Sequence, residues 1–179
     1  MRAYYFDDLP GDQRAPHDSG KPVDPAVLDK IGVLRWQIPV STNGQYPEID
    51  AVARERDYKN RDVITITKEG LGELYESKIK MFYEEHMHED EEIRYTLEGS
   101  GYFDVREHPS DSWIRIAVSA GDLIVLPAGI YHRFTLDQRN MIKAMRLFKD
   151  EPKWTPYNRD AETDANPHRQ QYLKTIAVN

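Results

Sequence analysis

The sequence predicts a mainly β protein, an antiparallel barrel or sandwich with a few peripheral α-helices. Short runs with strand propensity recur between residues 93 and 148, and turn residues separate each run from the next. Helical spacing of apolar residues occurs before these runs, between about Leu71 and Tyr83. The length of 179 residues is enough for one domain with a buried core.

The first seventy residues are expected to contribute strands and two helices. Asp24 and Pro25 begin the first helix, because aspartate caps helix N-termini and proline is tolerated at the first helical position. Gly32 ends it. The second helix is a charged surface helix from Pro47 to Arg56. The expected strands are Ala3–Phe6, Val33–Ile38 and Val63–Thr67, and the expected loops are Leu9–Pro22 and Ser41–Tyr46.

The middle of the chain changes from a helical to an alternating pattern. Apolar residues at helical spacing predict a helix from about Leu71 to Tyr83. Two alternating runs, Ile93–Leu97 and Tyr102–Arg106, flank the turn-like Glu98-Gly99-Ser100-Gly101 and predict a hairpin. Further strands are expected at Trp113–Val118, Leu123–Leu126, His132–Leu136 and Lys143–Phe148, and a polar, irregular segment from Asp150 to Pro167.

Composition excludes several classes of protein. The net charge of −7 argues against a nucleic-acid binder, which normally carries a basic surface. The absence of cysteine excludes a disulfide framework, a zinc-thiolate site and a cysteine nucleophile. The N-terminus lacks the apolar core of a signal peptide, and no apolar run approaches the ~20 residues of a membrane span. A cytosolic protein is therefore expected, without a nucleic-acid or membrane partner.

The most informative motif is a pair of alternating histidines, His86 and His88, followed by Glu92 and, forty residues later, His132. Residues i and i+2 of a strand share a face, so the two histidines can reach one ion. A straight strand would carry Glu92 roughly 13 Å past His88 at ~3.3 Å per residue, so the chain must bend at Glu89-Asp90-Glu91. His132 must come from a neighbouring strand.

Three imidazoles and one carboxylate suit Fe(II), Mn(II), Ni(II), Co(II) or Zn(II). On an octahedral ion such a set leaves two positions open, enough for a bidentate substrate. A single His-x-His pair occurs by chance on exposed strands, but the four residues together with Gly99, Gly121, Pro127 and Gly129 predict a metal site. The other three histidines, His17, His108 and His168, lie in loop-like segments and are expected to be exposed and without a role.

These residues resemble the two motifs of the cupin superfamily, small antiparallel β-barrels of jelly-roll type that hold a metal in the barrel mouth. Within it, residues 82–95 and 127–134 look very like those of acireductone dioxygenases, and residues 4–8 and 152–159 are also similar to that family. The resemblance therefore spans most of the chain. Lys80 and Leu136 depart from the broad cupin pattern, which often has glycine and asparagine there, but neither is a proposed ligand.

The resemblance implies a step of methionine salvage. The substrate would be 1,2-dihydroxy-5-(methylthio)pent-1-en-3-one, which the Fe(II) form cleaves with O2 to 4-methylthio-2-oxobutanoate and formate. The Ni(II) form would give 3-methylthiopropanoate, formate and carbon monoxide. One divalent ion per chain, Fe(II) or Ni(II), would be held by His86, His88, Glu92 and His132. A monomer is expected, in the cytoplasm, with the nucleus as a second location.

Strand parity extends the site to its surroundings. Arg94 lies two residues after Glu92 on the same face, where a fixed cation would favour an anionic enediolate; the alternative is an ion pair at the barrel rim. Phe134 follows His132 by two residues and should also face inward. Phe82, Phe103 and Phe134 are expected to wall the methylthio tail, although each could equally be ordinary core.

The same residues are compatible with two other functions. One is a metal-dependent cupin isomerase or decarboxylase that does not use O2, and the other is a non-enzymatic cupin that binds a metal or small molecule. The whole chain, 1–179, is predicted to be one cupin domain. Its parts are N-terminal strands and helices packed on the barrel (1–70), the metal-binding barrel core (71–149) and a C-terminal polar tail (150–179).

Overall fold

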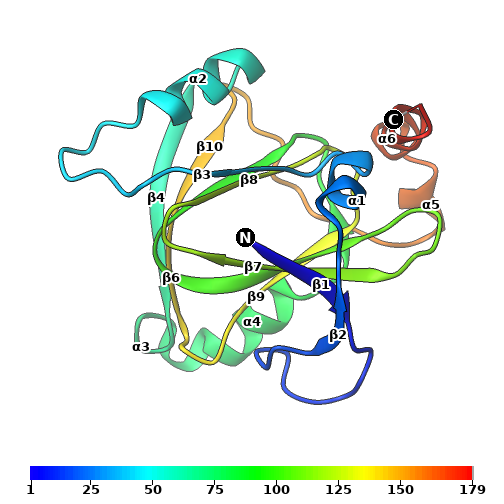
Figure 1. The fold of residues 1–179 in the computed structure, drawn as a ribbon, viewed down its shortest axis with the longest axis horizontal. Coiled ribbons are helices and arrows are strands. Elements are labelled where there is room, and N and C mark those ends of the chain that lie inside the picture. The colour runs from blue at the N-terminus through cyan, green and yellow to red at the C-terminus, as the bar shows by residue number, and fades with distance from the viewer. Residues whose placement is uncertain (179) are drawn as a thin grey trace.

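Two antiparallel sheets that share one long strand form the protein in this computed structural model, which describes residues 1–178 (Figure 1). The strands are β1 (Arg2–Phe6), β2 (Asp18–Pro22), β3 (Leu34–Gln37), β4 (Asn60–Thr67), β5 (His86–Met87), β6 (Glu92–Arg106), β7 (Trp113–Ser119), β8 (Asp122–Leu126), β9 (His132–Leu136), β10 (Met141–Phe148) and β11 (Tyr157–Asn158). One sheet has the order β11-β5-β9-β6-β7-β1-β2, and the other β4-β10-β6-β8-β3. The predicted mainly β fold class is confirmed.

Short helices surround the sheets, as predicted. They are α1 (Pro25–Lys30), α2 (Pro47–Arg56), α3 (Lys68–Leu71), the 3₁₀ turn η1 (Gly72–Leu74), α4 (Tyr75–Phe82), α5 (Ala161–Asp164) and α6 (Pro167–Ile176). Asp24 caps α1, as the sequence indicated, by accepting a hydrogen bond from the Ala26 amide at 2.8 Å. No helix within residues 1–178 is both long enough and apolar enough to cross a membrane.

The core is divided between the two faces of the sheet that contains β8. Ile124 and Leu126 lie between the two sheets, packed with Ile114 and Ile116 of β7. The alternate residues of β8, Leu123 and Val125, face the other way and belong to a second cluster under α2. This alternation places Glu92 and Arg94 of β6 on the face between the sheets, because Glu92 pairs with Leu126 and Arg94 with Ile124.

The predicted hairpin at residues 93–106 is wrong. β6 runs without interruption through Glu98–Gly101 and pairs with β8 and β10 in its first half, then with β7 and β9 in its second. Gly99 has a φ of 76°, and a side chain there would collide with the Met141 carbonyl. The neighbouring register shift lies between Lys143 and Ala144. Glycine therefore bends the strand from one sheet into the other instead of reversing it.

Three further segments differ from the prediction. β2 lies inside the expected loop Leu9–Pro22, and the expected helix from Leu71 is broken into α3, η1 and α4 where Gly72 has a φ of 53°. The polar C-terminal segment contains β11, α5 and α6. α6 packs on the core through Tyr172, whose buried hydroxyl donates to the Ile31 carbonyl at 2.8 Å. These C-terminal elements depend on contacts with distant residues, which local periodicity does not reveal.

Candidate metal centre

The strands β5, β6 and β9 meet at one end of the barrel and carry the four predicted ligands. The chain leaves β5 after His86 and Met87, bends at Glu89 and Asp90, and returns as β6, which begins at Glu92. This is the bend that strand spacing predicted. His132 is the first residue of β9 and pairs directly with His86.

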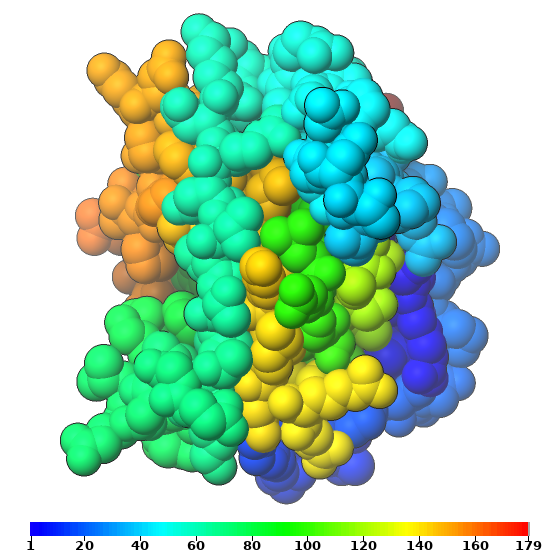
Figure 2. Space-filling model, turned by 90° about the vertical axis from the view of Figure 1, so that its left-hand side faces the viewer, coloured from blue at the N-terminus to red at the C-terminus, as the bar shows by residue number. Residues whose placement is uncertain are grey.

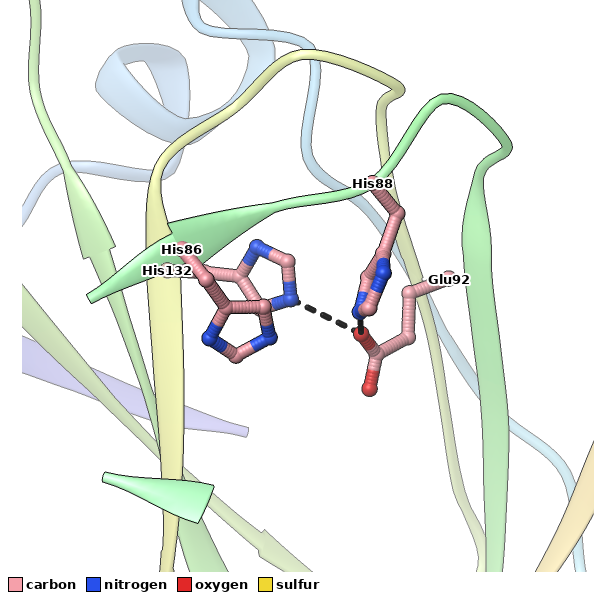
Figure 3. A group of neighbouring side chains, drawn as sticks. All are labelled: His86, His88, Glu92 and His132. Carbon is pink, nitrogen blue, oxygen red and sulfur yellow. Dashed lines mark hydrogen bonds and ion pairs between the residues drawn. The ribbon is translucent and has the colours of Figure 1, made fainter. Parts of the chain in front are cut away.

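One ligand atom from each of the four residues lies within 4.8 Å of the others (Figure 3). Glu92 contacts two of the three histidines. Its Oε2 atom lies 2.8 Å from His132 Nε2 and 3.3 Å from His88 Nε2. The ring centroids of His86 and His132 are 4.5 Å apart. The structure thus brings together all four residues that the sequence singled out.

Backbone carbonyls set the orientation of all three imidazoles. Each Nδ1 atom bonds a carbonyl oxygen: His86 with Glu84 at 2.6 Å, His88 with Thr155 at 3.1 Å and His132 with Ile130 at 3.0 Å. A carbonyl oxygen can only accept a hydrogen bond, so Nδ1 carries the proton in each ring. Nε2 is then the ligating atom, and such a carbonyl partner is the usual outer support of a metal-bound histidine.

The charges favour the protonation states that ligation needs. Burial lowers the pKa of His86 to about 4, so this ring is neutral at neutral pH. Burial acts to raise the pKa of Glu92, but the charges of Arg94 and His132 hold it well below its usual range. Burial also opposes protonation of His88, and its hydrogen bond to Glu92 nevertheless raises the pKa of that ring. A bound ion would replace this proton.

The donor set fits a divalent transition-metal ion. Three imidazole nitrogens and one carboxylate oxygen converge, and the sequence contains no cysteine to supply a softer ligand. His132 is buried, but the other three ligand residues are partly exposed; the side chain of His88 is 17% accessible and that of Glu92 12%. Solvent and a small molecule can therefore reach the group, as an open coordination position requires.

Arg94 occupies the inner face predicted for it. Its Nη1 donates to the Ile93 carbonyl at 3.0 Å, and its Nη2 lies 3.5 Å from Glu92 Oε1. Its Nε atom donates to no group of residues 1–178. The Arg94 guanidinium thus lies beside the four proposed metal ligands, called the metal group below, and has N–H donors left to bind a ligand.

The three predicted phenylalanines form a connected aromatic group. Phe82 is the last residue of α4, and its ring lies 6.5 Å from that of Phe134 on β9. The ring centroid of Phe103 lies 5.0 Å from that of Phe134. Phe82 and Phe134 are half-buried, whereas Phe103 is only 4% exposed and belongs to the core. Of the three, Phe82 and Phe134 are open to a ligand.

The sequence did not reveal that residues 153–159 lie along the metal-binding segment. The Lys153 amide donates to Asp90 at 2.8 Å, and β11 pairs with β5 beside His86. Arg159 binds Glu85 through both its amide, at 3.1 Å, and its guanidinium, at 2.9 Å. Together with the Thr155 carbonyl, these contacts fix the strand that carries two of the histidines. Backbone contacts of this kind have no side-chain signature in a sequence.

The remaining histidines do not join the group. His17 is buried, contrary to the prediction, and its Nδ1 lies 2.8 Å from Asp7. His108 is exposed as predicted. His168 is partly exposed, and its Nδ1 lies 3.0 Å from Glu89, which pins the start of α6 near the metal-binding turn.

Comparisons with known proteins agree with this geometry. Residues 2–156 match the model of the ARD/ARD' family. The chain is 64% identical to acireductone dioxygenase 1 of Coprinopsis cinerea, over 99% of each chain, and 62% identical to acireductone dioxygenase of Phaeosphaeria nodorum, over 97% of this chain and 96% of that one. A solved acireductone dioxygenase of Bacillus anthracis, with a cadmium ion in its active centre, is similar in fold. It is 25% identical with a TM-score of 0.64, over 73% of this chain and 86% of that one.

Proposed function

This chain belongs to the ARD/ARD' family, and from that premise we propose how its metal centre serves the acireductone dioxygenase reaction. The protein is an acireductone dioxygenase of methionine salvage. We propose that its Fe(II) form cleaves 1,2-dihydroxy-5-(methylthio)pent-1-en-3-one with O2 to 4-methylthio-2-oxobutanoate and formate. Both oxygen atoms of O2 enter the products, so the reaction needs no external reductant.

The observation that carries the proposal is the convergence of four donor atoms from His86, His88, Glu92 and His132. These residues would hold one divalent ion per chain, Fe(II) or Ni(II). When bound, the ion would supply a Lewis acid and a template for two oxygens of the substrate. With Ni(II), the proposed products are 3-methylthiopropanoate, formate and carbon monoxide.

The surrounding residues bind and orient the substrate. The Arg94 guanidinium, fixed by the Ile93 carbonyl, favours the anionic enediolate over its protonated form. Phe82 and Phe134 lie on the same end of the barrel and offer an apolar wall for the methylthio tail, with Phe103 supporting Phe134 from the core. The protein therefore determines which end of the substrate meets the metal group.

An assay with and without O2 tests the reaction class. Metal-loaded protein is mixed with acireductone under nitrogen and under air, and substrate absorbance and formate are followed. We expect consumption and formate only under air. Enzymatic turnover under nitrogen would contradict the proposal and would support an isomerase or decarboxylase. No consumption in either gas by protein that retains its metal would support a non-enzymatic binding module.

The proposed metal dependence has its own test. Apo-protein is loaded with Fe(II) or with Ni(II), and the headspace is analysed for carbon monoxide. We expect carbon monoxide from the Ni(II) form alone, and equal product mixtures from both forms would contradict the proposal. We further propose a monomer, supported by the net charge of −7, which disfavours self-association. We also propose that it acts in the cytoplasm, with the nucleus as a second location. Analytical ultracentrifugation and cell fractionation test these two points.

A further inference from the structure

A second arginine shares the inner face with Arg94. Arg146 on β10 is the direct cross-strand partner of Arg94 on β6. Directly opposite residues of an antiparallel pair project on the same side of the sheet, with Cβ atoms about 5 Å apart. Arg94 shares that side with Glu92. The register therefore places Arg146 on the face that carries the metal group.

Arg146 is held in a fixed orientation. Its Nε and Nη2 atoms donate to the two carboxylate oxygens of Asp62 on β4, at 2.9 and 2.7 Å. The Trp154 ring lies 4.5 Å from the guanidinium carbon. Figure 2 shows β4 running down the face turned to the viewer, with β10 beside it. Among residues 1–178, β4 pairs with no strand other than β10, so Arg146 and Asp62 lie at the edge of their sheet. The Nη1 atom donates to no group of residues 1–178.

The pairing of two arginines across neighbouring strands is unfavourable by itself, because like charges directly opposite each other destabilise a sheet. Asp62 neutralises Arg146 through a bidentate bond, and Glu92 is the carboxylate nearest to Arg94. Glu92, however, is also the carboxylate ligand proposed for the metal ion. With a divalent ion bound, this face would carry more positive than negative charge, and both arginine side chains are about one-fifth exposed.

We propose that Arg146 is a second substrate-binding cation, which together with Arg94 holds the delocalised negative charge of an enediolate. Asp62 is the positioning residue that orients the Arg146 guanidinium. The proposal rests on the proposed function, which supplies an anionic substrate. Arg94 lies beside the metal group, and Arg146 presents Nη1 one strand further out. An anion between the strands bonds both guanidinium groups and offsets the repulsion between them.

Substitution of Arg146 by methionine tests this role, because methionine keeps the length of the side chain and removes the charge. Binding of acireductone is measured anaerobically by calorimetry on metal-loaded protein, and KM and kcat are measured in air. We expect Arg146→Met to raise both the dissociation constant and KM about tenfold, the effect of one charge-assisted hydrogen bond, with unchanged metal content. Increasing salt should weaken binding more in the wild type than in this variant.

Two further variants separate binding from folding. Arg61 is adjacent to Asp62 on β4 but faces outward and bonds Asp50 at 2.6 Å, so Arg61→Met removes the same charge from the opposite face. It should leave KM unchanged. Asp62→Asn keeps the Arg146 charge but loosens its orientation, and should raise KM about threefold. If Arg146→Met fails to fold, Arg146→Lys gives the same test, with an expected loss smaller than tenfold.

The outcomes are distinct. An Arg146→Met variant that binds acireductone as tightly as the wild type would overturn the proposal, and so would an equal loss in Arg61→Met. A fall in kcat without a change in KM would also overturn it, since Arg146 would then not act in binding. A wild-type protein that binds acireductone under nitrogen but does not consume it with O2 would instead contradict the proposed dioxygenase reaction.

Discussion

Replacing Arg94 by methionine should slow turnover while leaving the metal in place. Methionine is similar in length to arginine, so the packing at this end of the barrel is kept. In the structure, Arg94 donates to the Ile93 carbonyl at 3.0 Å and lies 3.5 Å from Glu92, and its remaining N–H groups can bind a substrate. Loss of an oriented, charge-stabilising donor costs about 10²-fold in kcat, or about 2.7 kcal/mol of barrier.

The effect on the metal should have the opposite sign. Arg94 is a cation next to the proposed ligand Glu92, so its removal reduces repulsion of a divalent ion. At neutral pH the variant should therefore retain metal at least as well as the wild type. On acidification the variant should lose metal at a higher pH than the wild type. The charge of Arg94 contributes most to lowering the pKa of Glu92, so without it this ligand is protonated at a higher pH.

The assay follows acireductone consumption under air by protein with a measured metal content. The matched control is Arg94→Lys, which keeps the charge but not the planar fork and should lose less activity than the methionine variant. A kcat for Arg94→Met within about twofold of the wild type, at equal metal content, would refute the reasoning and make Arg94 a structural residue of the barrel rim.

Three further outcomes are expected. His88→Ala should abolish metal retention, as measured by elemental analysis after gel filtration; full occupancy would remove His88 from the ligand set. Asp104→Asn should lower stability by about 3–5 kcal/mol and the midpoint of thermal unfolding by roughly 10 °C, because the buried Arg115 and the partly buried Arg133 share this buried carboxylate; an unchanged melting curve would contradict the assignment. The Arg146 hydrogen bonds lower the pKa of Asp62, so this stabilisation is present near neutrality and lost as pH falls through the folded-state pKa. Asp62→Asn should therefore lose less stability on acidification than the wild type, and parallel losses would contradict this.

Side-chain periodicity was sufficient to predict that the four proposed metal ligands come together. His86, His88 and Glu92 are close in the chain, and strand parity with a required bend determines how they meet. His132 could be added because the turn at Pro127 and Gly129 starts a new strand. Parity also placed Arg94 and Phe134 on the inner face. The predicted convergence of these side chains is found in the structure because it depends on alternation within single strands, whereas their role as metal ligands stays a prediction.

The missed features depend on pairing between distant segments. Arg146 meets Arg94 only through the register of β6 with β10, which includes an irregularity at Lys143. The support of His88 by the Thr155 carbonyl involves a main-chain atom. The expected hairpin was wrong because glycine serves bends as well as turns, and only the contact of Gly99 with the backbone of a neighbouring strand distinguishes the two.

Titration of the apo-protein with Fe(II), with acireductone-dependent O2 uptake as the readout, tests the central claim most directly. Because one group of four donor atoms is proposed to hold the ion, activity should rise linearly and stop at one equivalent of metal per chain. O2 uptake should match acireductone consumption mole for mole. Activity in fully metal-free protein, a break at two equivalents, or acireductone turnover without O2 uptake would contradict the account.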